Sequence, residues 1–312
     1  MSAGTRTPPL RTRLRRARRR TVAGVRLTWA RGSLRLLELA SPAAADRKAL
    51  DLWCALPEPR SGKDHRTTAG VVHRLAVPRG GTIAAEVWGD GPVVYLVHGW
   101  GGWRGQLGAF VAPLVEAGYR VVAADAPSHG DSDDGFLGPR RGTVMEMIET
   151  FEVVGREFGP AAGVVAHSLG CTVAGQVVTG ELPVERLVLI APNHGFQDVL
   201  DQFAHVLRLS RRTADHLRDA LEGITQRPLS AFDLDALGAD GSMPETLVVH
   251  DRADKETPYR VGAELAAAWP NAHLVTTEGL GHQRILADAG TVTTVVGHVT
   301  AVEPADERRR RR

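Results

Sequence analysis

The stretch Val164–Thr172, VVAHSLGCT, decides how this chain is interpreted. An apolar run, typical of a buried strand, meets a helix-like segment at Ser168. Ala166 and Gly170 are small enough to let the strand and the helix pass close together. The pattern therefore indicates a nucleophilic serine on a sharp turn. Because a serine hydroxyl is a weak nucleophile, the rest of the chain must supply a base, an orienting acid and donors for an oxyanion.

Outward from this turn, short apolar runs alternate with amphipathic stretches, which is typical of strand-helix units in a mostly parallel sheet. We predict strands near 70–76, 82–88, 93–97, 120–125, 163–167, 186–190, 246–250 and 272–276. The alternation stops between Pro192 and Gly238, where two amphipathic helices are expected. We interpret residues 192–240 as a small helical lid over the carboxyl ends of the strands, where ligands bind in open α/β sheets.

The strand VVYLV runs into HGWGGW, His98 to Trp103, and the glycines of this loop let the backbone fold back with its N–H groups free. The backbone amides of Trp100 and Leu169 are therefore the predicted oxyanion hole. The strand AHLVT is followed by TEGLGHQRIL, whose glycines allow the loop to bring His282 onto Ser168. His282 is the predicted base.

The orienting acid is expected at the carboxyl end of the strand TLVVH, which runs into DRADKETP. Asp254 is the first choice for this acid and Asp251 is the second. The chain order of the three side chains is then Ser, Asp, His, as in one of the known arrangements of a catalytic triad.

The motifs HGWGG, DAPSHGDS, AHSLG, HDRADKETP and GLGHQRIL, in this order and spacing, resemble those of the α/β-hydrolase superfamily. The resemblance covers about residues 70–300 and is greatest to bacterial single-domain hydrolases with a short helical lid. It implies a fold of about eight strands flanked by helices. It also implies that Ser168 is the nucleophile, His282 the base and Asp254 the acid, with Trp100 and Leu169 as oxyanion donors.

Two features qualify this resemblance. Ala166 stands where the first glycine of the turn motif is usual. A serine nucleophile, rather than an aspartate, argues against the dehalogenase and epoxide-hydrolase branches of the superfamily. The chain is therefore expected to cleave a carboxylic ester or thioester through an acyl-enzyme, with a small-molecule substrate and no cofactor. A hydrolase-fold binding module with a misaligned triad, and a lipid esterase attached to a membrane surface, stay as alternatives.

The charge is concentrated at the two ends of the chain. Residues 1–20 carry eight Arg and no acid, and residues 308–312 are all Arg, so the body is acidic although the formal net charge is +2. We predict a disordered tail over 1–20, a helical extension over 21–69, the α/β-hydrolase domain over 70–300 and a C-terminal tail over 301–312. Neither tail interleaves aromatic residues with its arginines, so no nucleic-acid partner is expected. Weak contact of the basic N-terminus with a membrane surface is a hypothesis, and the oligomeric state is left open.

Cys54 and Cys171 form neither a disulfide framework nor a metal-binding spacing, so a reducing compartment and no metal site are expected. No apolar run is long enough for a membrane span, and charges interrupt the segment after the basic N-terminus. We therefore expect a cytoplasmic protein, with peripheral membrane contact as the alternative. His98, His129 and His250 stand at strand ends and are interpreted as structural.

Overall fold

The computed structural model describes residues 10–57, 64–180, 182–193 and 195–301, with the backbone alone for residues 10–23. The chain divides into two compact units. The larger unit contains Cys54–Phe196 and resumes at Pro228, and it holds the sheet. The smaller unit contains the N-terminal helices and Gln197–Arg227.

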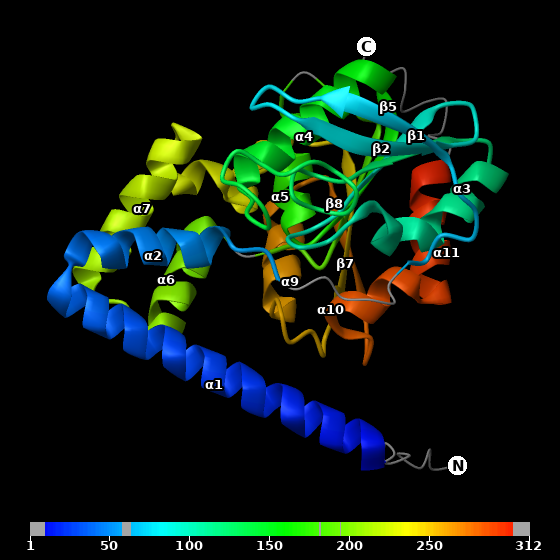
Figure 1. Cartoon of the computed structure of the whole chain (residues 1–312). Coiled ribbons are helices and arrows are strands. Elements are labelled where there is room, and N and C mark those ends of the chain that lie inside the picture. Colours follow the sequence, from blue (N-terminus) through cyan, green and yellow to red (C-terminus); the bar gives the residue numbers. More distant parts are fainter. Residues whose placement is uncertain (1–9, 58–63, 181, 194, 302–312) are drawn as a thin grey trace. The chain divides into compact units, whose positions relative to one another are not determined.

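Within the described residues, eight strands form one sheet in the order β1-β2-β4-β3-β5-β6-β7-β8 (Figure 1). Their bounds are β1 Val71–Ala76, β2 Thr82–Trp88, β3 Val93–Val97, β4 Arg120–Ala124, β5 Ala161–His167, β6 Arg186–Ile190, β7 Glu245–Asp251 and β8 Ala272–Thr277. β2 is antiparallel to both β1 and β4, and every other neighbouring pair is parallel. The eight predicted strands are thus confirmed. Because β3 to β8 run in one direction, their carboxyl ends meet at one edge of the sheet, where the candidate site lies.

The helices of the larger unit connect these strands and cover both faces of the sheet (Figure 1). Their bounds are η1 Arg104–Phe110, α3 Val111–Glu116, α4 Val144–Phe158, α5 Leu169–Val178, η2 Leu229–Phe232, α8 Leu234–Leu237, α9 Tyr259–Ala268, α10 Gly281–Arg284, η3 Ile285–Ala287 and α11 Ala289–Thr300. The N-cap of α4 is Thr143, whose hydroxyl accepts a hydrogen bond from the N–H of Glu146 at 3.2 Å. Such a cap contributes about 1 kcal/mol to helix stability.

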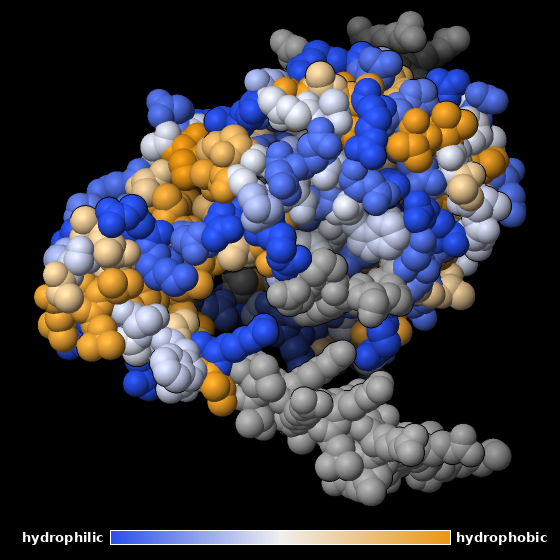
Figure 2. All heavy atoms as spheres, in the orientation of Figure 1, coloured by the Kyte–Doolittle hydropathy of each residue, from blue (hydrophilic) through white to orange (hydrophobic). Residues whose placement is uncertain are grey.

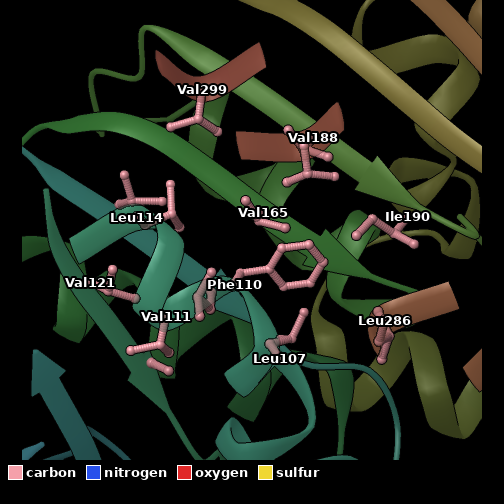
Figure 3. Packing of buried hydrophobic residues seen from close by; sticks show 14 of the residues in the cluster. Leu107, Phe110, Val111, Leu114, Val121, Val165, Val188, Ile190, Leu286 and Val299 are labelled. Atoms are coloured by element: carbon pink, nitrogen blue, oxygen red, sulfur yellow. The ribbon is translucent and has the colours of Figure 1, made fainter. Parts of the chain in front are cut away.

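The side chains of β3 alternate between the two faces, as the period of a strand requires. Val94 and Leu96 belong to the main hydrophobic cluster, together with η1, α3, η3 and α11. Figure 3 shows Phe110 of this cluster among Leu107, Val165 and Ile190. Tyr95 instead packs on α4, where its ring lies 5.3 Å from the ring of Phe151. The sheet is therefore buried on both faces, and this rigid layer fixes where the strand ends point.

The smaller unit is built from α1 Leu10–Ala40, α2 Pro42–Cys54, α6 Phe196–Leu207 and α7 Arg211–Thr225. Glu38 accepts a hydrogen bond from the N–H of Ser210 at 2.7 Å, and Arg212 forms a two-pronged ion pair with Asp46 at 2.8 and 3.0 Å. The rings of Trp53 and Phe203 pack edge to face at 5.2 Å. Much of the predicted lid thus forms one packed unit with the N-terminal extension. Its position over the strand ends stays a prediction.

The expectation of a disordered tail over residues 1–20 is wrong for its second half, because α1 begins at Leu10. Arginine and leucine are good helix formers, so this segment joins the helix that follows it, despite its charge. Residues 1–9 and 302–312, with most of the predicted C-terminal tail, lie outside the described residues. Among the residues that the structure describes, no helix has both the length and the hydrophobicity to cross a membrane.

Candidate active site

Ser168 stands alone between the end of β5 and the start of α5, in a backbone conformation that L-residues rarely adopt. Its φ is 55° and its ψ is −125°. Such a conformation costs about 1–3 kcal/mol and persists only where the surroundings enforce it. Here the N–H of Ser168 donates to Ile190 O at 3.0 Å, and its own carbonyl accepts from the N–H of Cys171 at 2.9 Å. The predicted sharp turn is therefore present.

Two glycines allow this turn to approach the loop after β3. A Cβ on Gly170 would lie 2.6 Å from the carbonyl oxygens of both Val97 and His98. A Cβ on Gly99 would lie 2.9 Å from His167 O and from Ser168 Cβ. Both distances are shorter than real contacts allow, so larger residues at either position would push the loop away from Ser168. The loop after β3 thus packs directly against the turn.

The backbone N–H groups of Trp100 and Leu169, the predicted oxyanion donors, belong to these two adjoining segments. Leu169 is the first residue of α5, where N–H groups have no partner inside the helix. Among the described residues, neither N–H group donates a hydrogen bond. The two groups are therefore available to an oxygen of a ligand, and the start of α5 favours negative charge beside it.

Two buried histidines hold the loop after β3, in agreement with their structural interpretation. His98 donates through Nδ1 to Gly99 O and accepts from the N–H of Ala126 at 3.1 Å. His129 donates through Nδ1 to Pro127 O and accepts from the N–H of Gly101 at 3.1 Å. Burial lowers the pKa of His98 to about 4 and that of His129 to about 3. Both rings are therefore neutral near pH 7, as acceptors must be.

A buried ionic cluster anchors the far end of the same loop. The guanidinium of Arg104 contacts the carboxylates of Glu86 at 2.8 Å, Asp131 at 2.6 Å and Asp125 at hydrogen-bonding distance, while its N–H donates to Asp125 at 2.7 Å. Glu86 also accepts from the N–H of Gly70 at 2.8 Å. Burial alone would raise the pKa of Glu86, but these hydrogen bonds outweigh it and lower that pKa. The role of Arg104 was not predictable from the sequence, because nothing in the pattern of the chain pairs it with Glu86 of β2 or with the acids of the loop after β4.

Asp254 and His282 meet at the carboxyl edge of the sheet, as predicted. His282 donates through Nδ1 to Asp254 Oδ2 at 2.7 Å, and the side chain of Asp254 is fully buried. The other oxygen of Asp254 accepts from the N–H groups of Glu256 at 2.8 Å and Thr257 at 3.0 Å. Burial acts to raise the pKa of Asp254, but the hydrogen bonds from His250, His282 and the backbone hold it well below its usual range. Asp254 is thus ionised at neutral pH, so the Nδ1 of His282 is the donor of this hydrogen bond.

Asp251, the second choice for the acid, has a different set of partners. Its carboxylate accepts from the N–H of Ala253 at 2.9 Å, the hydroxyl of Thr277 at 2.8 Å and the N–H of Leu280 at 2.9 Å. These contacts join the loop after β7 to the loop after β8, which carries His282. No contact joins Asp251 to His282 among the described residues. The geometry therefore favours Asp254 as the orienting acid. Asp251 instead holds the loop after β8 against the end of β7.

His282 lies next to the sharp turn. Nε2 of His167, the neighbour of Ser168, donates to His282 O at 2.9 Å, and the two imidazole rings are 4.7 Å apart. Within the described part of the chain, no hydrogen bond joins Ser168 Oγ to His282. Catalytic hydrogen bonds of this kind often tighten only when substrate binds. His167 has a positioning role that the sequence pattern does not signal, since it occupies a variable position of the turn motif.

His250 lies behind Asp254 and is completely buried. Its Nε2 donates to Thr257 O at 3.2 Å and is 3.5 Å from Asp254 Oδ2, while Nδ1 has no hydrogen-bond partner among the described residues. The structural interpretation of His250 is therefore incomplete, because the ring also contacts the carboxylate of the candidate acid. The side chains of His282, Asp254 and His250 therefore form a line of polar contacts that reaches into the core.

No group of three or more His, Cys, Asp or Glu side chains within the described residues is arranged to hold a metal ion. This edge of the sheet does bring together a strained serine, an imidazole on a buried carboxylate, and two N–H groups to which no described residue offers an acceptor. These are the groups that acyl transfer to a serine needs.

Comparison with known proteins covers the same part of the chain. Residues 93–294 match the model of the Alpha/beta hydrolase family, and every candidate site residue falls within this range. The chain is 26% identical over 237 residues to the 2-hydroxy-6-oxononadienedioate/2-hydroxy-6-oxononatrienedioate hydrolase of Comamonas testosteroni, covering 62% of this chain and 82% of that protein. It is also 26% identical over 238 residues to the 2-hydroxy-6-oxo-6-phenylhexa-2,4-dienoate hydrolase of Burkholderia cepacia, with the same coverage of 62% and 82%.

Solved structures show the same fold at lower sequence identity. An esterase from Exiguobacterium antarcticum aligns with a TM-score of 0.58 and 18% identity, over 74% of this chain and all of that chain. A thioesterase domain from the curacin biosynthetic pathway aligns with a TM-score of 0.57 and 19% identity, over 75% of this chain and all of that domain. At this identity the likeness concerns the fold alone.

Proposed function

Since this chain belongs to the alpha/beta hydrolase family, we propose that it is a serine hydrolase that cleaves a carboxylic ester or thioester through an acyl-enzyme. Ser168 is the proposed nucleophile, His282 the base and Asp254 the orienting acid. Trp100 and Leu169 are the proposed oxyanion donors. Membership of the family supports a hydrolase, and the assignments of individual residues rest on the geometry of the site.

The observation that carries the proposal is the 2.7 Å contact between His282 Nδ1 and the buried carboxylate of Asp254. A carboxylate that accepts from Nδ1–H fixes the tautomer in which Nε2 can take a proton. The same histidine is tied through its carbonyl to His167, one residue from the strained Ser168. A base and a nucleophile on neighbouring segments are what the first chemical step requires.

In the proposed first step, Ser168 Oγ attacks the carbonyl carbon of the substrate while His282 Nε2 takes the hydroxyl proton. The negative charge that develops on the carbonyl oxygen is met by the N–H groups of Trp100 and Leu169. The bond from the carbonyl carbon to the leaving oxygen or sulfur then breaks, and the leaving group takes the proton from His282. The acyl group remains on Ser168 as an ester.

In the second step, water replaces the leaving group. His282 accepts a proton from the water, the resulting hydroxide adds to the acyl carbon, and the bond to Ser168 Oγ breaks as His282 returns the proton to that oxygen. Asp254 remains ionised throughout and stabilises the imidazolium that forms in both steps. The proposed steps use only protein groups and water.

A kinetic experiment tests this proposal. The substrates are p-nitrophenyl esters of graded acyl length and the matching N-acetylcysteamine thioesters. We expect Ser168→Ala to reduce hydrolysis by about 10⁴-fold or more, while Ser230→Ala, at an exposed serine of η2, leaves the rate unchanged. Undiminished turnover by the Ser168 variant, with its fold intact by circular dichroism, would reject the nucleophile.

A second candidate reaction comes from the names of the curated relatives, which act on 2-hydroxy-6-oxo acids. Hydrolysis of a carbon–carbon bond in such a compound is therefore the alternative chemistry for the same site. 2-Hydroxy-6-oxo-6-phenylhexa-2,4-dienoate, assayed beside the esters, separates the two. A kcat/KM for this compound that exceeds every ester and thioester value would replace the ester proposal.

A further inference from the structure

Among the described residues of the smaller unit, one apolar face of α1 is exposed, and we propose that it binds an anionic lipid surface. This face lies on α1 and is formed by Val25, Trp29, Leu36 and Leu39. Their exposed fractions are 51%, 75%, 69% and 74%, the highest among the large hydrophobic residues from position 24 to the end of α2. We call it the outer face of α1.

The spacing of these residues makes a continuous stripe. Each helical residue advances by about 100°, so positions 25, 29, 36 and 39 fall within about 40° of one line along the helix. Gly32 lies on the same line, and a Cβ built on it meets no described atom within 4 Å. Figure 2 shows hydrophobic residues on the surface near the junction of α1 and α2.

The outer face of α1 takes no part in the packing of the smaller unit among the described residues. Leu34 stands on the opposite side of the helix and is 1% exposed. On that inner side, Arg31 donates through Nε to Val206 O at 2.7 Å, and Glu38 accepts from the N–H of Ser210 at 2.7 Å. The helix is thus apolar on two sides, one of which holds the unit together. Within the smaller unit, no described residue buries Trp29, Leu36 or Leu39.

The charge around the stripe identifies the kind of partner. Residues 1–37 contain eleven arginines and no acidic residue. Arg26 and Arg35 flank the stripe on its two sides, and both are exposed. An exposed tryptophan and leucines bordered by arginines match an interfacial helix, which inserts its apolar residues at the level of the headgroups. Anionic headgroups would neutralise the arginines.

A second copy of this chain fits the stripe less well. Two such helices side by side would place many arginines close together with no acidic residue from that stretch to pair with. Repulsion between like charges opposes that arrangement and is relieved at an anionic surface. The contact proposed here concerns α1 alone and does not depend on the chemistry of Ser168.

Vesicle sedimentation tests the proposal on the full chain. The wild type is expected to sediment with phosphatidylcholine vesicles that contain phosphatidylglycerol and to stay in solution with pure phosphatidylcholine. Trp29→Ser combined with Leu36→Ser should weaken this partition by about tenfold or more, because the buried apolar area is lost. Val71→Ser with Phe136→Ser, at two exposed apolar residues of the larger unit, is the matched control and should bind like the wild type.

Size-exclusion chromatography with light scattering, on the same proteins without lipid, tests whether a second copy of this chain binds the outer face of α1 instead. The wild type and the Trp29, Leu36 variant should have the same mass. Three results overturn the proposal. The first is sedimentation of the wild type that does not increase with phosphatidylglycerol, and the second is a Trp29, Leu36 variant that binds vesicles like the wild type. The third is a wild-type dimer that becomes a monomer in this variant. Measuring binding without substrate keeps this outcome separate from that of the ester assay.

Discussion

The loop after β3 and the loop after β7 supply the candidate site in different ways. In the first loop the proposed functional group is a backbone N–H, that of Trp100, and side chains from other segments hold the loop in place, such as His129 on Gly101. In the second the proposed functional group is the carboxylate of Asp254, and the neighbouring Asp251 ties this loop to the loop after β8. Substitutions should therefore act on the first loop through backbone position and on the second through lost side-chain chemistry.

Among substitutions in these two loops, Asp254→Asn gives the largest expected effect on rate. The amide cannot hold the Nδ1–H tautomer of His282 as the carboxylate does, so kcat should fall by about 10³–10⁴-fold with little change in fold. Steady-state kinetics on the best ester, with circular dichroism as the check on folding, measures this loss. Asp251→Asn is the matched control, and its loss of kcat should be far smaller. An equal or larger loss for Asp251→Asn would reverse the two assignments.

Arg104→Met tests the support of the loop after β3. Removing the guanidinium leaves the buried carboxylate of Asp125 without its cation, so the free energy of unfolding should fall by about 3–5 kcal/mol. Urea denaturation followed by fluorescence measures the change. Arg120→Met is the control, because its partner Asp90 is exposed and the loss should be smaller. Equal losses would show that burial of the Arg104 cluster has little influence.

Gly99→Ala should disturb the oxyanion site through the backbone. The added methyl meets His167 O and Ser168 Cβ at 2.9 Å, so the loop must retreat from the turn. Loss of one oxyanion donor reduces kcat by about 10²-fold or more, and we expect a loss of this order. Trp100→Ala keeps the N–H group and should lower kcat by less than about tenfold. A larger effect of Trp100→Ala than of Gly99→Ala would mean that the indole, rather than the amide, acts in the site.

The support given by Asp251 should depend on pH. Burial acts to raise its pKa, but hydrogen bonds from Gly281, Leu280, Thr277 and Ala253 lower it below the usual range. A depressed pKa means that the ionised carboxylate stabilises the fold above about pH 4 and that this contribution is lost as the pH falls further. The free energy of unfolding of the wild type should exceed that of Asp251→Asn by about 1–3 kcal/mol at pH 7, and by less at pH 3. A difference that grows on acidification would contradict this role.

The fold was predictable because its signals are local. Apolar runs separated by amphipathic stretches predict the strands, and Gly118 marks the end of α3 with a positive φ of 87°. The meeting of Asp254 with His282 follows from the parallel sheet, since both come after strands that end at one edge. The catalytic roles of these residues stay a prediction.

Long-range partners were not predictable from the pattern. Glu38 and Ser210 are 172 residues apart in the sequence. No pattern in either segment predicts that the N-terminal helices pack with Gln197–Arg227 as one unit. Asp251 and Asp254 are three residues apart in a loop, where no periodicity separates them. Only the hydrogen bonds distinguish the carboxylate that faces His282 from the one that faces the backbone. His250 was missed as a neighbour of Asp254 for the same reason.

Labelling with a fluorophosphonate, followed by peptide mass spectrometry, shows most directly whether Ser168 is an activated nucleophile. This reagent reacts with a serine only when a base activates it. We expect one adduct, on the peptide that contains Ser168, and a much slower reaction in the His282→Gln variant. An unlabelled wild type, or an adduct that forms at the same rate without His282, would contradict this expectation.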